Sequence, residues 1–400
     1  MRSIVDLKQK KLLDVLRIIQ IHGSFSKPNI AIRANINSVT AHYIITELEK
    51  AGLVVSNGVA KSNGGRKAVL YSINPNYGYI IGQNHGRTKI TTSVYDLSLN
   101  TVYVNLKKSE LTNSNVSINN MKEEIERAIH NSGVPKDKFL GIGITLPGQV
   151  NHREGVVNSM LNLNDWDNTP IQSIIESFTG LPACVYNDNR ANIISCKWLN
   201  KIPESAIAVY INISDGVGVG VMINGEVFSG SHSFAGELGH IEISGHKAIC
   251  LCGNVGCIET LVCTANIIRQ VKKRYELSAS NGDSNKAFVN EIIQMAKDGN
   301  NGVYSIIKEA TQNISHIIDA VVKAYDPEKI IIYNPWLLHF NELFNDLVDA
   351  VFRKCNWLKK NTLSIEIDAS NVIDSYGPVS IVLENLFNFD SENRIGLKID

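Results

Sequence analysis

The sequence predicts an α/β protein in which a small, basic head of helices and a hairpin precedes a larger body. Three observations lead to this expectation. Apolar side chains recur at helical spacing over the first 50 residues, and two short strand patterns follow them. From Tyr79 onward, β-branched apolar runs alternate with longer helical patterns, as is typical of an α/β body. The segment 74–78, with Pro75 and Gly78, indicates a linker between the two.

The composition is that of a globular chain with more than one domain. It has 400 residues, of which 44% are hydrophobic and 20% are charged. No apolar run reaches the roughly 20 residues that cross a bilayer, and charges interrupt the N-terminal apolar runs, unlike a signal peptide. We therefore expect a cytoplasmic protein without a membrane partner, in which the seven cysteines are reduced.

The net charge of zero conceals an asymmetry between head and body. Residues 1–77 hold 11 Lys and Arg against 4 Asp and Glu, a balance of +7. Residues 78–400 hold the remaining 28 and 35, a balance of −7. A basic head on an acidic body indicates that the head alone contacts a polyanion, although a chance distribution of surface charge is the alternative.

The head has the sequence pattern of a helix-turn-helix. Residues 7–22 predict a first helix. Ser26 is a predicted N-cap for a short second helix, and Asn37 is one for a third helix, Ser38 to about Lys50. The short segment 33–36 forms the turn between the second and third helices.

A predicted β-hairpin follows the third helix and completes a winged helix-turn-helix domain over residues 1–73. Its two short strands, 53–55 and 68–73, flank a polar, glycine-rich tip. Gly64 and Gly65 let the backbone approach a phosphate or a groove closely. Arg66 and Lys67 add positive charge at the same tip, which suits a narrow minor groove.

The third helix is the expected recognition helix of this domain. In a winged helix-turn-helix its start enters the major groove of DNA. The predicted outward residues Ser38, Thr40, His42 and Tyr43 can hydrogen-bond to phosphates or base edges. An ordinary solvated helix face is the alternative for these side chains, but the charge and the hairpin favour DNA binding.

The body is expected to form two lobes with a cleft between them. Strands are expected at 79–82, 88–95, 101–106, 139–145, 183–186, 206–213, 218–223 and 329–333. Helices are expected near 118–129, 171–178, 264–275, 303–324, 338–354 and 377–388, the last of them following Gly377.

A histidine and three cysteines form a metal-ligand pattern in the body. His240 precedes Cys250, Cys252 and Cys257 by ten or more residues, and the cysteines follow the spacing Cys-x-Cys-x4-Cys. Three thiolates and one imidazole suit a closed, structural zinc site, whereas reduced thiols packed as small apolar groups are the alternative. Acids beside this cluster, at Glu237 and within 255–259, can accept hydrogen bonds from a polyhydroxylated ligand.

Four segments of the body, in this order, carry a resemblance to a known family. They are Gly141–Gly148, Tyr186–Asn189, Asp215–Gly220 and the block from Glu237 to Glu259. Together they resemble the ROK family of repressors, open reading frames and sugar kinases. With the predicted winged helix in front, the whole chain resembles the ROK transcriptional repressors, which include xylose and N-acetylglucosamine repressors.

The resemblance implies a two-lobed, actin-like ATPase (RNase H-like) fold for the body, residues 79–400, with a zinc-binding loop and a sugar in the cleft. Lobe one would span about 79–188 together with the C-terminal helix 377–388, and lobe two about 189–376. The zinc ligands would be those of the cluster described above.

Five residues match the sugar contacts of ROK sugar kinases. Asn187 and Asp188 match a pair that binds sugar, in which the aspartate is the general base for phosphoryl transfer. Glu237 and His240 match the family's Glu-x-Gly-His motif, and Glu259 matches the acid after the last zinc cysteine. A helix cap before residues 189–198 is the alternative interpretation of the Asn-Asp pair.

The nucleotide side departs from the kinase pattern in three places. Asn84 and Arg87 replace an acid and a glycine in the first phosphate loop. The second loop, Gly-Thr-Gly in kinases, has Asp215, whose carboxylate would repel phosphate oxygens. A Gly-Gly pair is replaced by a turn in which Pro335 and Trp336 occupy the space that the glycines would leave open.

These patterns predict a sugar-responsive DNA-binding regulator rather than an enzyme: a repressor of carbohydrate-utilisation genes that binds operator DNA as a homodimer or homotetramer. Asp188 would be a vestigial base that accepts a hydrogen bond from the sugar effector, and residual kinase activity stays open. One alternative is an active ROK sugar kinase with an accessory DNA-binding head. Another is a DNA-binding dimer that senses a phosphosugar, held by Arg87, or a partner protein. The identity of the sugar, and activation instead of repression, also stay open.

Overall fold

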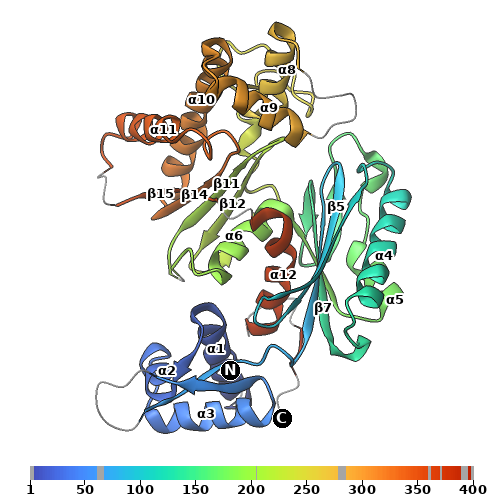
Figure 1. Ribbon diagram of the computed structural model, residues 1–400, viewed down its shortest axis with the longest axis vertical. Helices are drawn as coiled ribbons and strands as arrows, with labels where there is room; N and C mark the ends of the chain where they lie inside the picture. The colour runs from blue at the N-terminus through green and yellow to red at the C-terminus, as the bar shows by residue number, and fades with distance from the viewer. Residues whose placement is uncertain are drawn as a thin grey trace. The chain divides into compact units, whose positions relative to one another are not determined.

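Two five-stranded sheets, each in its own structural unit, organise the computed structural model of the chain (Figure 1). Unit 1 comprises Met1–Lys201 and Val372–Asp400, and unit 2 comprises Ile202–Asn371. The structure describes residues 4–60, 67–203, 205–277, 285–358, 362–369, 372–388 and 395–397.

The head of unit 1 contains three helices and a small antiparallel sheet. The elements are α1 (Ile4–His22), β1 (Phe25–Ser26), α2 (Lys27–Arg33), α3 (Ser38–Lys50), β2 (Val54–Val59) and β3 (Val69–Ile73). The sheet has the order β1-β3-β2, and β1 is too short for the sequence pattern to have revealed it. Gly64, Gly65 and Arg66 lie outside the described residues, and Lys67 is exposed.

Both predicted helix caps of the head are present. The Ser26 hydroxyl lies 3.5 Å from the backbone N–H of Asn29, and Asn37 Oδ1 accepts a 2.7 Å hydrogen bond from the N–H of Thr40. Each cap satisfies a backbone donor that the first helical turn leaves without an intrahelical partner. The helices therefore begin at the residues that the sequence indicates.

The body of unit 1 is built on a mixed sheet with the order β10-β7-β4-β5-β6. Its strands are β4 (Tyr79–His85), β5 (Lys89–Asp96), β6 (Thr101–Lys108), β7 (Phe139–Leu146) and β10 (Ala183–Asn187), and β8 (Gln149–Asn151) pairs with β9 (Val156–Ser159) beside it. One face carries α4 (Ser114–Asn131) and α5 (Ile171–Thr179), and the other carries α6 (Asp188–Trp198) and α12 (Val372–Phe387), as Figure 1 shows. The remaining short helices of this unit are η1 (Lys136–Lys138) and η2 (Asn164–Trp166).

Glycines in two strands let α12 lie directly on the sheet. A Cβ atom on Gly143 would stand 1.7 Å from the carbonyl oxygen of Pro378, and one on Gly82 would stand 2.7 Å from Val379 Cγ2. The helix begins at Val372, so the expected start after Gly377 is wrong. Tertiary packing overrides the local breaker signal, because close contact with the sheet stabilises a helix that includes both a glycine and a proline.

Helix α6 belongs to unit 1, whereas the second lobe was expected to begin at residue 189. The difference arises because α6 packs along α12 and shares a buried polar cluster with it. Lys197 Nζ lies 2.9 Å from Glu384 Oε1, and Trp198 Nε1 donates to Glu384 Oε2 at 3.0 Å. Asn388 Nδ2 adds a third donor at 2.9 Å. A buried carboxylate with this many donors is well compensated, and losing it leaves an uncompensated ammonium group.

Unit 2 has the strand order β13-β12-β11-β14-β15, in which β11, β14 and β15 run parallel. The strands are β11 (Ala208–Ile213), β12 (Val217–Ile223), β13 (Glu226–Val227), β14 (Lys329–Tyr333) and β15 (Ser364–Ile367). The helices are η3 (Leu238–His240), α7 (Glu259–Val262), α8 (Thr264–Arg274), α9 (Asn285–Lys297), α10 (Asn301–Tyr325) and α11 (Asn341–Lys354). Helix α9 and strand β15 were not anticipated from the sequence. None of the described helices in either unit is both long and apolar enough to span a membrane.

Removing the buried carboxylate of Glu384 should destabilise unit 1 much more than removing an exposed one. We expect Glu384→Ala to lower the free energy of unfolding by about 3 kcal/mol, because Lys197 stays buried without its counter-charge. Glu123→Ala is the matched control: Glu123 also pairs with a lysine at 2.9 Å but is 61% exposed, so its loss should lower the free energy of unfolding far less. Urea unfolding followed by tryptophan fluorescence measures both, and equal losses would contradict the interpretation.

Candidate functional site

The predicted metal ligands of unit 2 lie together. The side-chain ligand atoms of His240, Cys250, Cys252 and Cys257 all lie within 4.8 Å of one another. Cys252 Sγ is 3.6 Å from Cys257 Sγ, and Cys250 Sγ is 3.6 Å from His240 Nδ1. Four donor atoms at these separations can surround one ion, so this cluster could hold a metal.

Burial of the Cys250 thiol also favours a cation at this cluster. The Cys250 side chain is buried, and burial raises the pKa of its thiol to about 12. A thiolate there therefore needs a compensating positive charge, which a bound metal ion supplies directly. The turn that presents the cysteines is tight: the N–H of Cys250 donates to Asn254 O, and Gly253, which adopts a positive φ of 91°, donates to Cys250 O.

His240 has its two ring nitrogens in different surroundings. Nδ1 faces the sulfur of Cys250, whereas Nε2 lies 3.8 Å from Glu237 Oε2. The imidazole can therefore bind a metal through one nitrogen and present the other beside the carboxylate. The Glu237 side chain is 42% exposed, so this edge of the ring is accessible to a ligand within unit 2.

The glycines of the segment Gly236–His240 allow this placement. A Cβ atom on Gly236 would lie 2.0 Å from the carbonyl oxygen of Val219, and one on Gly239 would lie 2.8 Å from that of Val217. Both contacts are with strand β12, so η3 can approach the strand only because these positions lack side chains. The spacing of the motif thus reflects packing as well as ligand chemistry.

Glu259 connects the His-Cys ligand cluster to the turn between β11 and β12. Its Oε2 accepts a 2.9 Å hydrogen bond from the N–H of Val217, and its Oε1 lies 3.7 Å from Cys250 Sγ. A Cβ atom on Gly216 would stand 3.0 Å from the same carboxylate, which explains the glycine in this turn. The sequence predicted a sugar contact at Glu259 and did not reveal this backbone contact.

In unit 1, Asn187 is the N-cap of α6. Its Oδ1 accepts hydrogen bonds from the N–H groups of Asn189 and Arg190, at 3.0 and 3.3 Å. Its Nδ2 donates to the carbonyl of Gly148 at 3.0 Å. The helix-cap alternative therefore describes Asn187, one residue earlier than expected, and its amide is held in a fixed orientation.

Asp188 occupies the first position of α6, beside that cap. It is half-buried, and its Oδ1 accepts hydrogen bonds from the backbone and side-chain amides of Asn189, both at 2.8 Å. The dipole of the helix favours a negative charge at this end. The carboxyl group is thus placed as a hydrogen-bond acceptor, which is compatible with either a sugar contact or a general base.

Basic groups that the sequence interpretation missed lie close to this pair. Arg190 is only 3% exposed and donates through Nη1 to the carbonyl of Val150 at 3.1 Å. The rings of His152 and Tyr186 lie 4.6 Å apart. Burial, followed by the charges of Arg190 and Arg153, lowers the pKa of His152 to about 4. Only the tertiary fold brings β8 beside β10, so no local pattern could have identified these residues.

Two of the residues that depart from the kinase pattern, Asn84 and Asp215, have hydrogen-bond partners within their own units. In unit 1, Asn84 Oδ1 accepts a 3.0 Å hydrogen bond from Thr145. In unit 2, Asp215 Oδ1 accepts one from Asn285 Nδ2 at 2.7 Å. Trp336 is fully buried in the core of unit 2. In the turn after β14, Asn334 Oδ1 accepts hydrogen bonds from the backbone N–H groups of Trp336 and Leu337.

The sequence profile of the ROK family matches residues 80–377, about three-quarters of the chain. The chain belongs to the ROK family. It is 28% identical over 394 residues to the xylose repressor of Caldicellulosiruptor bescii, covering 96% of this chain and 98% of that protein.

Two solved structures place the ROK fold in context. A ROK family transcriptional regulator, described as a homolog of the E. coli MLC protein, covers 94% of this chain and 97% of its own, with 24% identity and a TM-score of 0.76. A ROK glucokinase from Streptomyces griseus covers 76% of this chain and 97% of its own, with 20% identity and a TM-score of 0.63. At these identities the likeness shows the fold alone, and this ROK chain matches the regulator over a larger share of its length.

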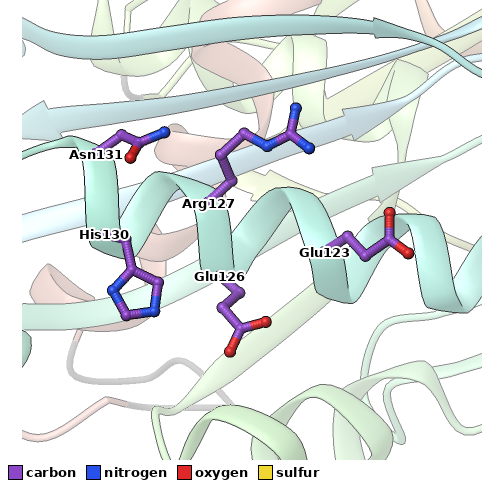
Figure 2. Close-up of a pocket in the computed structure, with 5 residues that line it drawn as sticks. All are labelled: Glu123, Glu126, Arg127, His130 and Asn131. Carbon is purple, nitrogen blue, oxygen red and sulfur yellow. The ribbon is translucent and has the colours of Figure 1, made fainter.

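A surface hollow in unit 1 of the ROK chain is lined by a different set of residues. Figure 2 shows its side chains, which project from one helix, α4: Glu123, Glu126, Arg127, His130 and Asn131. None of them is among the predicted sugar or metal residues. Charged side chains along one exposed helix are typical of a solvated face, so the hollow is not the candidate site.

His152, whose pKa is lowered by burial, should make the stability of unit 1 of this ROK chain sensitive to acid. His152 has a folded-state pKa of about 4, below its usual 6.5, so only the unfolded chain takes up a proton between these values. The free energy of unfolding should therefore fall as pH drops from about 6.5 to 4, by roughly 2 kcal/mol for this group. His152→Gln should flatten the profile, measured by urea unfolding at each pH, and His130→Gln, at an exposed histidine, is the control. Identical profiles for wild type and His152→Gln would contradict the assignment.

Proposed function

We propose that this chain is a DNA-binding transcriptional repressor whose affinity for its operator changes when a sugar binds the ROK body. The observation that carries the proposal is the union, in one chain, of a basic three-helix head with a ROK body that holds all five sugar-contact residues of the family pattern. The xylose repressor of Caldicellulosiruptor bescii is similar over 96% of the chain, head included, which supports the same organisation here.

The head supports the proposal as a winged helix-turn-helix. Ser38, His42 and Tyr43 are exposed on α3, and Thr40 is half-buried beside them. Two lysines lie beside this helix: Lys27 Nζ is 3.3 Å from His42 Nδ1, and Lys8 Nζ is 5.2 Å from the centre of the Tyr43 ring. Lysines in this position suit contacts with DNA phosphates. Such contacts would position the neighbouring hydrogen-bonding side chains against the bases. The hairpin tip with Gly64, Gly65, Arg66 and Lys67 would add minor-groove contacts.

The sugar would be recognised by acceptors whose orientation is already fixed. The proposed sugar contacts are Asn187 and Asp188, at the start of α6, and Glu237, the Nε2 edge of His240 and Glu259. Carboxylates accept hydrogen bonds from several sugar hydroxyls, and held side chains lose little conformational freedom on binding.

Zinc is the metal that fits the ligand cluster best. Zn–S bonds of about 2.3 Å in a tetrahedron place two thiolates roughly 3.8 Å apart, close to the 3.6 Å between Cys252 and Cys257. His240, Cys250, Cys252 and Cys257 would hold the ion in a closed, structural site. Its role would be to orient the imidazole of His240 for the sugar.

Helix α6 offers a route from the sugar to the head within unit 1. Asp188 is its first residue, and the helix packs along α12. Helix α1 of the head lies against both α6 and α12. A sugar that binds more tightly with α6 in one of two positions would therefore shift the equilibrium between two conformations of the head. The shift can be no larger than the difference in sugar-binding free energy between those conformations. In a dimer or tetramer this would alter the half-site spacing that two heads can span.

An active sugar kinase with a DNA-binding head is the second candidate. The half-buried carboxyl group of Asp188 favours it, because a positioned carboxylate can serve as a general base. Asp215 weighs against it, since its carboxylate stands in the turn that contacts phosphate in ROK kinases. A coupled assay showing sugar-dependent ATP turnover at 1–100 per second, the usual order of magnitude for kinases, would favour the enzyme.

A DNA and sugar titration tests the proposal. Duplexes enriched from a random library by the full chain should bind it less tightly in the presence of xylose, glucose or N-acetylglucosamine, by roughly 5–150-fold. Asp188→Asn should keep the DNA affinity and lose most of this response, because a carboxylate acceptor is removed. Asp137→Asn, in η1 of the same unit, is the control. Failure to enrich any duplex, or a response that survives in Asp188→Asn, would contradict the proposal.

A metal measurement tests the zinc site and its connection to the sugar. The wild-type chain should contain about one zinc per molecule by atomic emission, and Cys252→Ser should lose most of it. The sugar response should fall in parallel, because His240 loses its orientation. Cys184→Ser, at a buried cysteine of unit 1, should keep both. A Cys252→Ser protein that lacks zinc but responds fully would disprove the connection.

A further inference from the structure

An exposed valine lies in the first turn of α3, on the outward face of the helix. Val39 is 79% exposed, whereas Ala41, Ile44, Ile45 and Leu48 of the same helix are buried. At about 100° per residue, Val39 points away from this buried stripe. Tyr43 and Thr46 follow it at i+4 and i+7, so the three side chains form one line along the helix.

This position differs from the sequence-based choice of contact residues. The pattern singled out polar side chains and passed over Val39, yet Thr40 is half-buried on the flank of the helix. The cap made by Asn37 fixes the first turn, in which Val39 is the second residue. Because a β-branched side chain in a helix has one strongly preferred rotamer, the two methyl groups are held toward solvent before any partner arrives.

We propose that Val39 contacts the C5-methyl group of a thymine in the major groove and so selects T·A over C·G at one position of the operator. This proposal rests on the proposed function. The methyl group is the apolar feature of the major groove, and contacts from small apolar side chains recognise it. DNA is the occupant that the charges favour: the first 77 residues have a balance of +7, and Lys8 and Lys27 lie beside the same helix.

The contact would provide specificity that the polar neighbours lack. Hydroxyl and imidazole groups at Ser38, His42 and Tyr43 can bond to phosphates and to several bases. A methyl–methyl contact excludes water only where thymine is present, and each buried methyl contributes a small, additive gain. The valine therefore acts as a discriminating residue rather than as a main source of affinity.

Replacing thymine by deoxyuridine removes the methyl group and leaves the hydrogen-bonding edge unchanged. The probe is a duplex enriched by the full chain, together with a copy in which deoxyuridine replaces every thymine. We expect wild type to prefer the thymine duplex by roughly fourfold for each methyl contact. Val39→Ser should bind both duplexes equally, and Val39→Thr, which keeps one methyl, should show an intermediate ratio.

Val116→Ser is the matched control. Val116 is 54% exposed and lies in the first turn of α4, which is also capped by an asparagine, Asn113. This variant should keep the wild-type thymine-to-deoxyuridine ratio, because the body makes no base contact. Fluorescence anisotropy at one fixed salt concentration measures all four proteins on both duplexes.

The outcomes separate this inference from the function on which it rests. Failure to enrich any duplex defeats DNA binding itself. If a duplex is enriched, an unchanged ratio in Val39→Ser overturns the methyl contact alone, and Val39→Thr decides the matter if the serine variant does not fold. A change in oligomeric mass with an unchanged ratio would assign Val39 to a protein contact, which also overturns it.

Discussion

The direct packing of α12 on the sheet of unit 1 is the contact on which the other features of that unit depend. It requires glycine at positions 82 and 143, because a side chain at either would collide with Pro378 or Val379. The helix then supplies Glu384, which holds the end of α6 through Lys197 and Trp198. The opposite end of α6 begins with the Asn-Asp pair, so the orientation of the candidate sugar acceptors depends on a helix nearly 200 residues away in sequence.

In unit 2, the ligand cluster of His240 and the three cysteines, together with Glu259, positions the candidate site residues. The carboxylate contacts a backbone N–H of the β11–β12 turn on one side and lies near the Cys250 sulfur on the other. One side chain thereby connects the β11–β12 turn to the ligand cluster. In the same unit, Asp215 of this turn is hydrogen-bonded to Asn285, and Trp336, after β14, is part of the core.

Local signals in the sequence predicted much of this and missed what only tertiary contacts determine. The caps at Ser26 and Asn37, strand β14 and the four ligand positions follow from short-range chemistry, and the structure has them where they were expected. The start of α12 was missed, because packing outweighs the breaker residues Gly377 and Pro378. The cap of α6 was placed one residue late, because Asn187 and Asp188 are both good capping residues. His152, Arg190 and Val39 were also missed, since burial and exposure emerge only when distant segments meet.

Thermodynamic linkage offers the sharpest measurement of the proposed coupling between head and body. Calorimetric titration of the full chain with the sugar that binds it, alone and when saturated with an enriched duplex, compares two sugar affinities without ATP present. If the sites are coupled, DNA must weaken sugar binding by the same factor by which sugar weakens DNA binding. Equal sugar affinities with and without DNA would show that the two sites are independent and that the chain is not a sugar-responsive repressor.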